Sequence, residues 1–243
     1  MRLESYSDII SIVQCQFPPL LILPKALMLR SFLDHIVVTA PSLEVGIQYV
    51  RQALGVPLEA GGRHPRMGTH NHLLRLGREQ YLEVIAIDPN APAPPRPRWF
   101  MLDQSAASSA PRLAGWVARI GDIQTALIAT SQAFGIIESM SRGDLGWQIT
   151  IPEDGSLPFE GVAPMLIQWS AGPHPADRLQ EHGCSLVQLE GFHPQAERIT
   201  DLLRTIGFQD SFVVSKRAAP LLVAHIQTPV GMRRLSTFGD PNG

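Results

Sequence analysis

Residues 61–88 read GGRHPRMGTHNHLLRLGREQYLEVIAID, and this stretch sets the fold expected for the chain. It opens with a glycine pair, which can adopt backbone turns that other residues resist. Residues 69–76 and 81–87 are strand-like runs, joined by a tight polar turn at residues 77–80. The second run is apolar except for Glu83. Because a lone buried carboxylate is costly, we expect Glu83 to have a partner in the folded chain.

The partner that the sequence suggests is His35, which lies in the apolar run LDHIVV at residues 33–38. Side chains alternate along a strand, so Leu33, His35 and Val37 are predicted to share one face. In the second run, Glu83 is predicted to share one face of its strand with Tyr81, Ile85 and Ile87. An imidazole and a carboxylate from separate apolar strands can line one pocket wall. We therefore take His35 and Glu83 as the candidate functional pair.

The composition is that of an ordinary globular protein. The chain has 243 residues, enough for one large or two small domains, and is 44% hydrophobic and 17% charged. Twenty basic against 22 acidic residues give a net charge of −2 without a basic cluster, which disfavours nucleic-acid binding. With only Cys15 and Cys184, we expect no structural disulfide and a reducing, cytoplasmic setting.

Residues 1–30 are predicted to be an N-terminal extension that packs poorly against the rest of the chain. Their apolar runs, at residues 9–13 and 20–23, are separated by prolines. No apolar stretch of the sequence reaches the roughly 20 residues that a membrane span requires. The extension also lacks the unbroken apolar core of a secretory signal. We therefore expect no membrane association.

A repeated unit is marked by three helical patterns, each ending in a large apolar residue, a glycine and another apolar residue. These endings lie at residues 54–56, 134–136 and 206–208. A glycine just past a helix is the expected left-handed cap. Helices of about four turns are predicted upstream. Their starts are marked by Ser42, Asp122 and Pro194.

Each predicted helix follows one strand-like run and precedes about three others. The leading strands are residues 33–38, 113–120 and 185–190. A helix on one face of each small, mostly antiparallel sheet predicts an α+β fold built from βαβββ units. We assign two paired units to residues 31–175 and a third to residues 183–238.

The units are joined by a stiff connector rather than by another strand. Residues 88–98 read DPNAPAPPRPR, and their prolines exclude a helix or an interior strand. The connector leads to Trp99 and Phe100, which we expect to anchor it against the core or to roof a pocket.

These features together resemble the vicinal-oxygen-chelate superfamily, and within it the glyoxalase-like domain branch. The likeness is carried by LDHIVV at 33–38, residues 61–77, YLEVIAIDP at 81–89 and RWFMLD at 98–103. It continues more weakly to about residue 175, while the third unit matches only in general shape. The resemblance implies an open, cup-shaped, mostly antiparallel sheet with helices on its outer face. It also implies a metal held by the first and last strands of each unit, which chelates vicinal oxygens of a substrate.

Carried over residue by residue, the resemblance makes His35 and Glu83 ligands of a divalent metal such as Zn, Mn, Fe or Ni. The second unit departs from this pattern, because Gly115 aligns with His35, and its neighbour Trp116 is no ligand either. Gln168 of the last strand is a weak donor for transition metals. A third ligand would have to come from Gln168 or from a histidine outside the strands. The histidines considered are His64 and His174.

Further residues are assigned to the pocket. His64 lies between glycines and a proline, where mobile catalytic groups often sit, and we give it a catalytic role with His35 and Glu83. Thr69 and Asn71 are predicted to face the cup, with His70 and His72 on the opposite face. The predicted substrate-binding residues are Thr69, Asn71, Arg75, Trp99, Trp116 and Gln168. Each also has a structural interpretation, since strand histidines and large aromatic residues are commonly part of the core.

Two functions follow as hypotheses. The first is an enzyme acting on a small oxygen-rich metabolite by isomerase, lyase or dioxygenase chemistry, with a metal on His35 and Glu83 or with the two side chains acting as a base and its orienter. The second is a metal-free protein that sequesters a small molecule in the same cup. Cups of this kind need paired units, so an odd third unit should pair with a second chain, as a homodimer, or cover the first two.

Overall fold

The computed structural model describes residues 29–104, 109–131 and 133–238. The first unit contains β1 (Ser31–Thr39), α1 (Leu43–Leu54), β2 (Glu59–His64), β3 (Thr69–Arg75) and β4 (Tyr81–Ile87). The short helix η1 (Trp99–Gln104) leads to the second unit, which contains β5 (Arg112–Ile120), α2 (Ile123–Ala129), β6 (Ile136–Arg142), β7 (Leu145–Ile151), η2 (Pro158–Gly161) and β8 (Met165–Trp169). After η3 (Pro175–Arg178), the third unit contains β9 (Ser185–His193), α3 (Ala196–Thr205), β10 (Phe212–Lys216), β11 (Leu221–Thr228) and β12 (Gly231–Ser236). Most of the predicted N-terminal extension, residues 1–28, lies outside the described residues.

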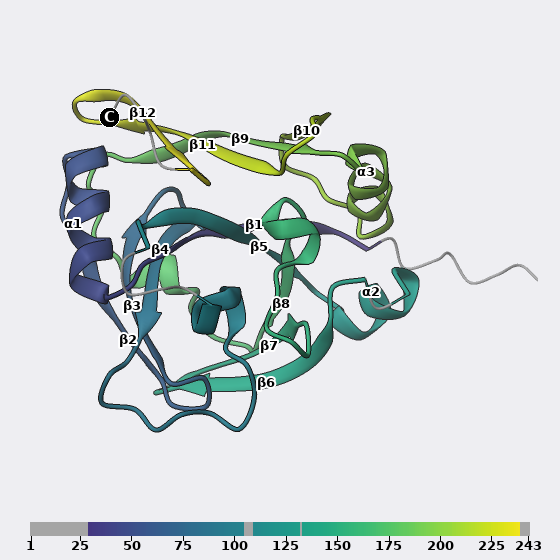
Figure 1. The fold of residues 1–243 in the computed structure, drawn as a ribbon, viewed down its shortest axis with the longest axis horizontal. Helices are drawn as coiled ribbons and strands as arrows, with labels where there is room; N and C mark the ends of the chain where they lie inside the picture. The colour runs from purple at the N-terminus through teal and green to yellow at the C-terminus, as the bar shows by residue number, and fades with distance from the viewer. Residues whose placement is uncertain (1–28, 105–108, 132, 239–243) are drawn as a thin grey trace, which may run out of the picture.

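The first two units form one eight-stranded sheet in the order β2-β3-β4-β1-β5-β8-β7-β6. In each unit the last strand pairs parallel with the first, as β4 does with β1 and β8 with β5. The units join where β1 runs antiparallel to β5. The sheet curls into a half-barrel, with α1 and α2 outside it (Figure 1). The predicted α+β cup is therefore confirmed.

Charged side chains connect the two sides of the half-barrel near its edge strands, β2 and β6. Arg66, just beyond β2, donates to the carbonyl of Ser139 in β6 at 3.0 Å and pairs with Glu138. Arg96 of the proline-rich connector pairs with the same Glu138 at 2.5 Å. Residues of the first unit are thereby held close to the last strand in the sheet order, β6.

The helix ends of α1 and the start of α2 follow the predicted capping signals, whereas α3 starts at Ala196 with Gln195 at its N-cap, so Pro194 lies before its first turn. Ser42 accepts a hydrogen bond from the Val45 amide, and Gly55 closes α1 in the left-handed conformation at φ 75°. Asp122 caps α2 in the same way as Ser42 caps α1. However, α2 ends at Ala129 instead of running for about four turns, and its C-cap Thr130 also donates through its hydroxyl to the Ala126 carbonyl.

The third unit has the expected order of elements, but its strands pair differently. Its sheet order is β10-β9-β11-β12, so the strand after the helix pairs parallel with β9, and β11 occupies the other edge of β9. In the first two units, the corresponding strands β1 and β5 pair with each other. Strand β9 therefore has no free edge for pairing with another unit.

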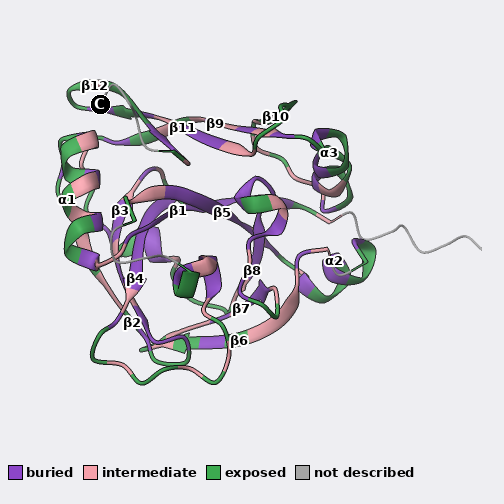
Figure 2. Ribbon diagram, viewed as in Figure 1, coloured by how far each residue is buried: buried purple, intermediate pink, exposed green. Residues whose placement is uncertain are grey.

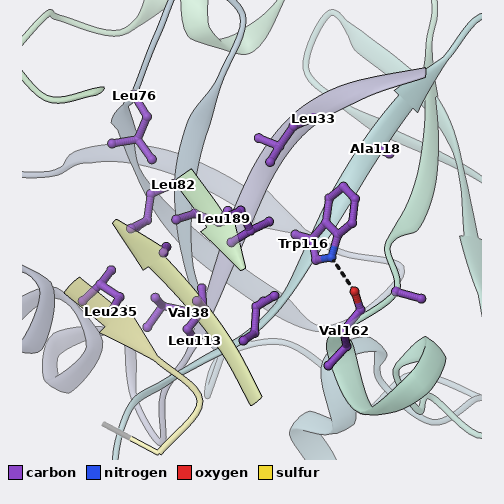
Figure 3. Close-up of a cluster of buried hydrophobic side chains, with 14 of the residues drawn as sticks. Leu33, Val38, Leu76, Leu82, Leu113, Trp116, Ala118, Val162, Leu189 and Leu235 are labelled. Atoms are coloured by element: carbon purple, nitrogen blue, oxygen red, sulfur yellow. Dashed lines mark hydrogen bonds between the residues drawn. The ribbon is translucent and has the colours of Figure 1, made fainter. Parts of the chain in front are cut away.

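The third unit's sheet covers the convex face of the half-barrel (Figure 1). Figure 2 shows β1 and β5 buried along most of their length beneath it. Figure 3 shows Leu33 and Trp116 of the larger sheet beside Leu189 of the smaller one. The Trp116 ring packs against Phe208 and Phe212, with ring centroids 5.1 and 4.8 Å away. The main hydrophobic core thus lies between the two sheets, on the opposite face from the concave side of the cup.

Candidate functional site

The concave face of the larger sheet holds a narrow hollow with a cavity volume of about 30 Å³. Aromatic and aliphatic side chains form most of its wall. They belong to Tyr81, Trp99, Phe100, Trp147, Ile149, Ile167 and Trp169. The polar lining side chains belong to His35, His64, Asn71, Glu83 and Arg142. Convergent polar groups set among aromatic and aliphatic side chains are typical of small-molecule sites.

The structure brings His35 and Glu83 together in this hollow. They lie on the neighbouring parallel strands β1 and β4, where His35 is level with Tyr81 and Val37 with Glu83. The two side chains are buried, and Nε2 of His35 lies 3.6 Å from Oε2 of Glu83. The Tyr81 ring stacks on the imidazole at 4.5 Å and restricts its rotation.

Asp34, next to His35, is the most connected acidic residue of the site. Its fully buried carboxylate accepts hydrogen bonds from Nδ1 of His35 at 2.7 Å, Nε2 of His174 at 3.0 Å and Nε1 of Trp169 at 2.9 Å. Burial alone would raise the pKa of Asp34, but the hydrogen bonds from His174 and His35 hold that pKa well below its usual range. Asp34 is therefore an ionised acceptor.

A β-bulge explains how adjacent residues point to the same side. In the β1–β5 register, Leu33 pairs with Ala118 and His35 with Val117, so Asp34 has no partner. The extra residue turns Leu33 into the convex core, while Val37 stays on the concave side with His35. The prediction that Leu33 shares a face with His35 and Val37 is therefore wrong, because strict alternation takes no account of a bulge.

A chain of hydrogen bonds runs from Glu83 across the hollow. Asn71 donates through its side-chain amide to Oε1 of Glu83 at 2.5 Å. The same Asn71 accepts from Nη1 of Arg142 at 3.1 Å, and this Nη1 also lies 3.4 Å from Nε2 of His64. A carboxylate can only accept and a guanidinium can only donate, so these two neighbours fix the orientation of the Asn71 amide.

His64 is buried beside this chain, at the end of β2 rather than in a loop. Burial, followed by the charge of Arg142 and other nearby histidines, lowers the pKa of His64 to about 3. Since Arg142 faces Nε2, the proton of the neutral ring belongs on Nδ1, which lies 3.1 Å from the Thr69 hydroxyl. His64 is thus a neutral side chain held between Thr69 and Arg142.

The other predicted pocket residues divide into two groups. Trp99 lines the hollow, and Thr69 supports it through His64. Three residues lie elsewhere. Arg75 donates to the carbonyls of Gly77 and Leu179, Gln168 accepts from the amide of Ile123 at the start of α2, and Trp116 donates to the carbonyl of Val162 in the convex core.

Sequence reasoning did not assign Asp34, Arg142 or Trp147 to the site. Asp34 could have been found as a second polar residue in an apolar strand, next to the histidine already chosen. Arg142 ends β6, a strand of mixed polarity with no apolar alternation to identify it. Its position in the hollow depends on how the half-barrel closes, which local sequence does not reveal.

The donor set around His35 and Glu83 does not complete a site for a divalent ion. Among the residues that the structure describes, no three His, Cys, Asp or Glu side chains are grouped to hold a metal. The residues considered for a third ligand are engaged elsewhere: His174 with Asp34, Gln168 with α2, and His64 with Arg142. A catalytic metal usually has about three protein ligands and an open position. The positive charge of Arg142 in the same hollow also opposes binding of a dication.

Comparison with known families agrees with this geometry. Residues 33–207 match the model of a family described as the glyoxalase-like domain. The chain belongs to the glyoxalase-like domain family. The match includes β1 from Leu33 onward, the rest of the cup and the first part of the third unit. The predicted placement in the vicinal-oxygen-chelate superfamily is therefore confirmed. A comparison with curated proteins found no match.

Two solved structures are similar to this chain at low sequence identity. A hypothetical protein from Staphylococcus aureus is 14% identical, with a TM-score of 0.54 over 78% of this chain and 87% of that one. Methylmalonyl-CoA epimerase from Streptomyces coelicolor, in complex with 2-nitronate-propionyl-CoA, is 16% identical, with a TM-score of 0.39 over 58% of this chain and 97% of that one. The first likeness shows the fold alone, and the second is too distant to carry an argument. None of the helices in the described parts of this glyoxalase-like chain is long and apolar enough to span a membrane.

Proposed function

We propose that this protein is an enzyme that transfers protons on a small oxygen-rich molecule bound in the cup. The observation that carries the proposal is the arrangement of Asp34, His35 and Glu83. Asp34 fixes the proton of His35 on Nδ1, so the lone pair of Nε2 faces the hollow beside Glu83. A histidine oriented by a buried carboxylate can act as a general base.

The proposed step begins at a carbon next to a carbonyl group. Nε2 of His35 takes the proton from this carbon, and the electrons of the broken C–H bond form an enolate. The Asp34 carboxylate stabilises the imidazolium produced. If the imidazolium passes its proton to the Glu83 carboxylate and Glu83 returns it to the other face of the carbon, the product is an isomer and both side chains regain their starting state. If the enolate instead expels a leaving group, the reaction is that of a lyase. Positioned acid–base groups of this kind contribute typically ~10²–10⁴-fold in rate.

Metal-assisted chemistry stays a separate prediction, and dioxygenase chemistry is part of it. Iron oxygenases commonly hold the metal with two histidines and a carboxylate, and His35 with Glu83 would supply two of those three ligands. Elemental analysis of protein purified without chelator tests this prediction, alongside a His35→Ala, Glu83→Ala double variant. Stoichiometric metal in the parent and none in the variant would replace the proposed metal-free step by a metal-dependent one.

A second candidate function is sequestration without catalysis. The paired rings of Trp147 and Trp169, with centroids 5.4 Å apart, favour it because they offer apolar surface to any small ligand. The homodimer and the cytoplasmic setting expected from the sequence also stay predictions. Light scattering at micromolar concentration tests the dimer, and a monomer would remove it.

Deuterium exchange in D₂O tests the proposed reaction. The probes are 2-oxobutyrate and butanone, which carry the same exchangeable CH₂ group next to a carbonyl, with and without a carboxylate. We expect the protein to accelerate exchange on at least one probe, and His35→Gln to abolish it. A matched control is the His225–Glu190 pair of the third unit, 2.9 Å apart and outside the cup. Loss of exchange in His225→Gln, or retention in His35→Gln, would contradict the proposal.

A further inference from the structure

Arg142 is a cation in the hollow that the proposed reaction does not use. It reaches from the end of β6 in the second unit to Asn71 and His64 of the first, and both contacts are made by Nη1. Both partners are neutral acceptors. Among the described residues, no carboxylate lies within ion-pair distance of this guanidinium, although Arg66 and Arg96 nearby each pair with Glu138. The remaining N–H groups of Arg142 are therefore available to a ligand.

Trp99 adds a second unused donor to the same hollow. Its side chain is 3% exposed and lines the hollow, and its indole Nε1 is buried with no hydrogen-bond partner in the described part of the chain. Buried donors are nearly always paired with the chain, a water or a ligand, and this one has no acceptor among the described residues. The Trp99 ring also packs edge-on against His64, at 5.1 Å, and His64 in turn faces Arg142.

The glycine pair that opens the sequence motif provides room for these groups. A Cβ at Gly62 would lie 2.7 Å from Cδ of Arg142, and one at Gly61 would collide with Oδ1 of Asn71. Any other residue at either position would push Arg142 or its support out of place. The absence of side chains at Gly61 and Gly62 thus leaves the space through which the Arg142 side chain extends from the second unit to the first.

We propose that the molecule bound in the cup carries a carboxylate, which is held by the guanidinium of Arg142 and the indole N–H of Trp99. This proposal rests on the proposed function, because it names the class of substrate for that site. Arginine presents paired N–H donors that match the two oxygens of a carboxylate. The apolar body of the ligand then packs against Trp147 and Ile149, with the reacting carbon near His35. The substrate class is a small carboxylic acid that also has a carbonyl group.

Binding is measured by the fluorescence of the tryptophans that line the hollow, using propionate and benzoate against propionamide and benzamide. Each acid and its amide have nearly the same shape, so the difference reports the charge. We expect the acids to bind at least about tenfold more tightly than the amides, as charge-assisted hydrogen bonds provide. Equal binding of acid and amide by the unaltered protein would overturn the proposal without any variant.

Variants then locate the effect. Arg142→Gln should weaken acid binding by about tenfold or more and leave amide binding unchanged. Arg142→Lys keeps the positive charge but loses the paired N–H donors of the guanidinium, so its affinity for the acids should be intermediate. The exposed Arg178→Gln is the control and should bind like the parent. Undiminished acid binding by Arg142→Gln would overturn the proposal.

The His35→Gln variant separates this proposal from the proposed function. We expect His35→Gln to bind the acids like the parent while it loses deuterium exchange. Exchange that depends on His35, with acid binding that does not depend on Arg142, would remove the carboxylate site and leave proton transfer. Acid binding that depends on Arg142, with exchange that does not depend on His35, would remove the proposed proton transfer and leave the carboxylate site.

Discussion

The carboxylate of Asp34 and Nδ1 of His35 lie 2.7 Å apart inside the cup, and His35 is the donor because Asp34 is ionised. The same carboxylate also accepts from His174 and Trp169, so one buried charge organises three side chains from distant parts of the sequence. This contact turns a strand histidine into an oriented base. It also explains why an acidic residue is buried at the bulge of β1.

Asp34→Asn should reduce both activity and stability. Its amide cannot accept from all three donors, so His35 loses its fixed tautomer and buried N–H groups are left unpaired. We expect exchange activity to fall on the order of 10²–10⁴-fold, and the free energy of unfolding in urea to fall by about 3–5 kcal/mol. Asp144→Asn, at an exposed position paired with Arg178, is the control and should change neither. Full activity in Asp34→Asn would contradict the role of this carboxylate.

His64 should make the protein less stable as the pH falls. Its pKa is about 3 in the folded state and about 6.5 when unfolded, so between these values the unfolded chain binds more protons and stability is lost on acidification. From about pH 7.5 to 5, this one group should cost about 2 kcal/mol of unfolding free energy. Urea unfolding of the parent and of His64→Gln at both pH values isolates the effect. Parallel losses in the two proteins would show that His64 is not held neutral.

Gly62→Ala should weaken carboxylate binding without removing any charge. The new Cβ would lie too close to Cδ of Arg142 and displace the guanidinium from Asn71 and His64. We expect several-fold weaker binding of propionate in the fluorescence titration, with no change for propionamide. Gly121→Ala is the control, since nothing lies within 4 Å of an added Cβ there. Unchanged propionate binding in Gly62→Ala would contradict the claim that Gly62 leaves the space needed by the Arg142 side chain.

Trp116 should act on stability rather than on ligand binding. It lies in the core between the two sheets, against Phe208 and Phe212, and not in the hollow. Trp116→Ala should lower the free energy of unfolding by about 3–5 kcal/mol, as truncation of a large core residue does. The exposed Val187→Ala serves as the comparison and should have little effect. An acid affinity that fell in folded Trp116→Ala protein would return this residue to the site.

The sequence predicts most of what local patterns control. The run of residues 81–87 becomes β4 with the same bounds, and Ser42, Gly55 and Asp122 cap their helices as expected. These features depend on periodicity and on single capping residues. The meeting of His35 with Glu83 could also be anticipated, because each is a polar residue within an apolar strand.

Features that depend on strand pairing could not be predicted in this way. Strand β2 contains the glycine pair and β6 is largely polar, so neither has the apolar alternation of a strand. The bulge at Asp34 appears only in the register between β1 and β5. Arg142 enters the cup because β2 and β6 approach each other when the sheet curls. The strand order of the third unit is likewise a tertiary outcome.

Nitrogen-15 NMR of the imidazole rings tests the central claim most directly. His35 and His174 share the Asp34 carboxylate, but His35 donates through Nδ1 and His174 through Nε2, so they should be opposite tautomers. At about pH 8, where an unperturbed imidazole is neutral, we predict that His35 carries its proton on Nδ1 and leaves Nε2 free to act as a base. A His35 ring with its proton on Nε2, or with both nitrogens protonated, would contradict the account.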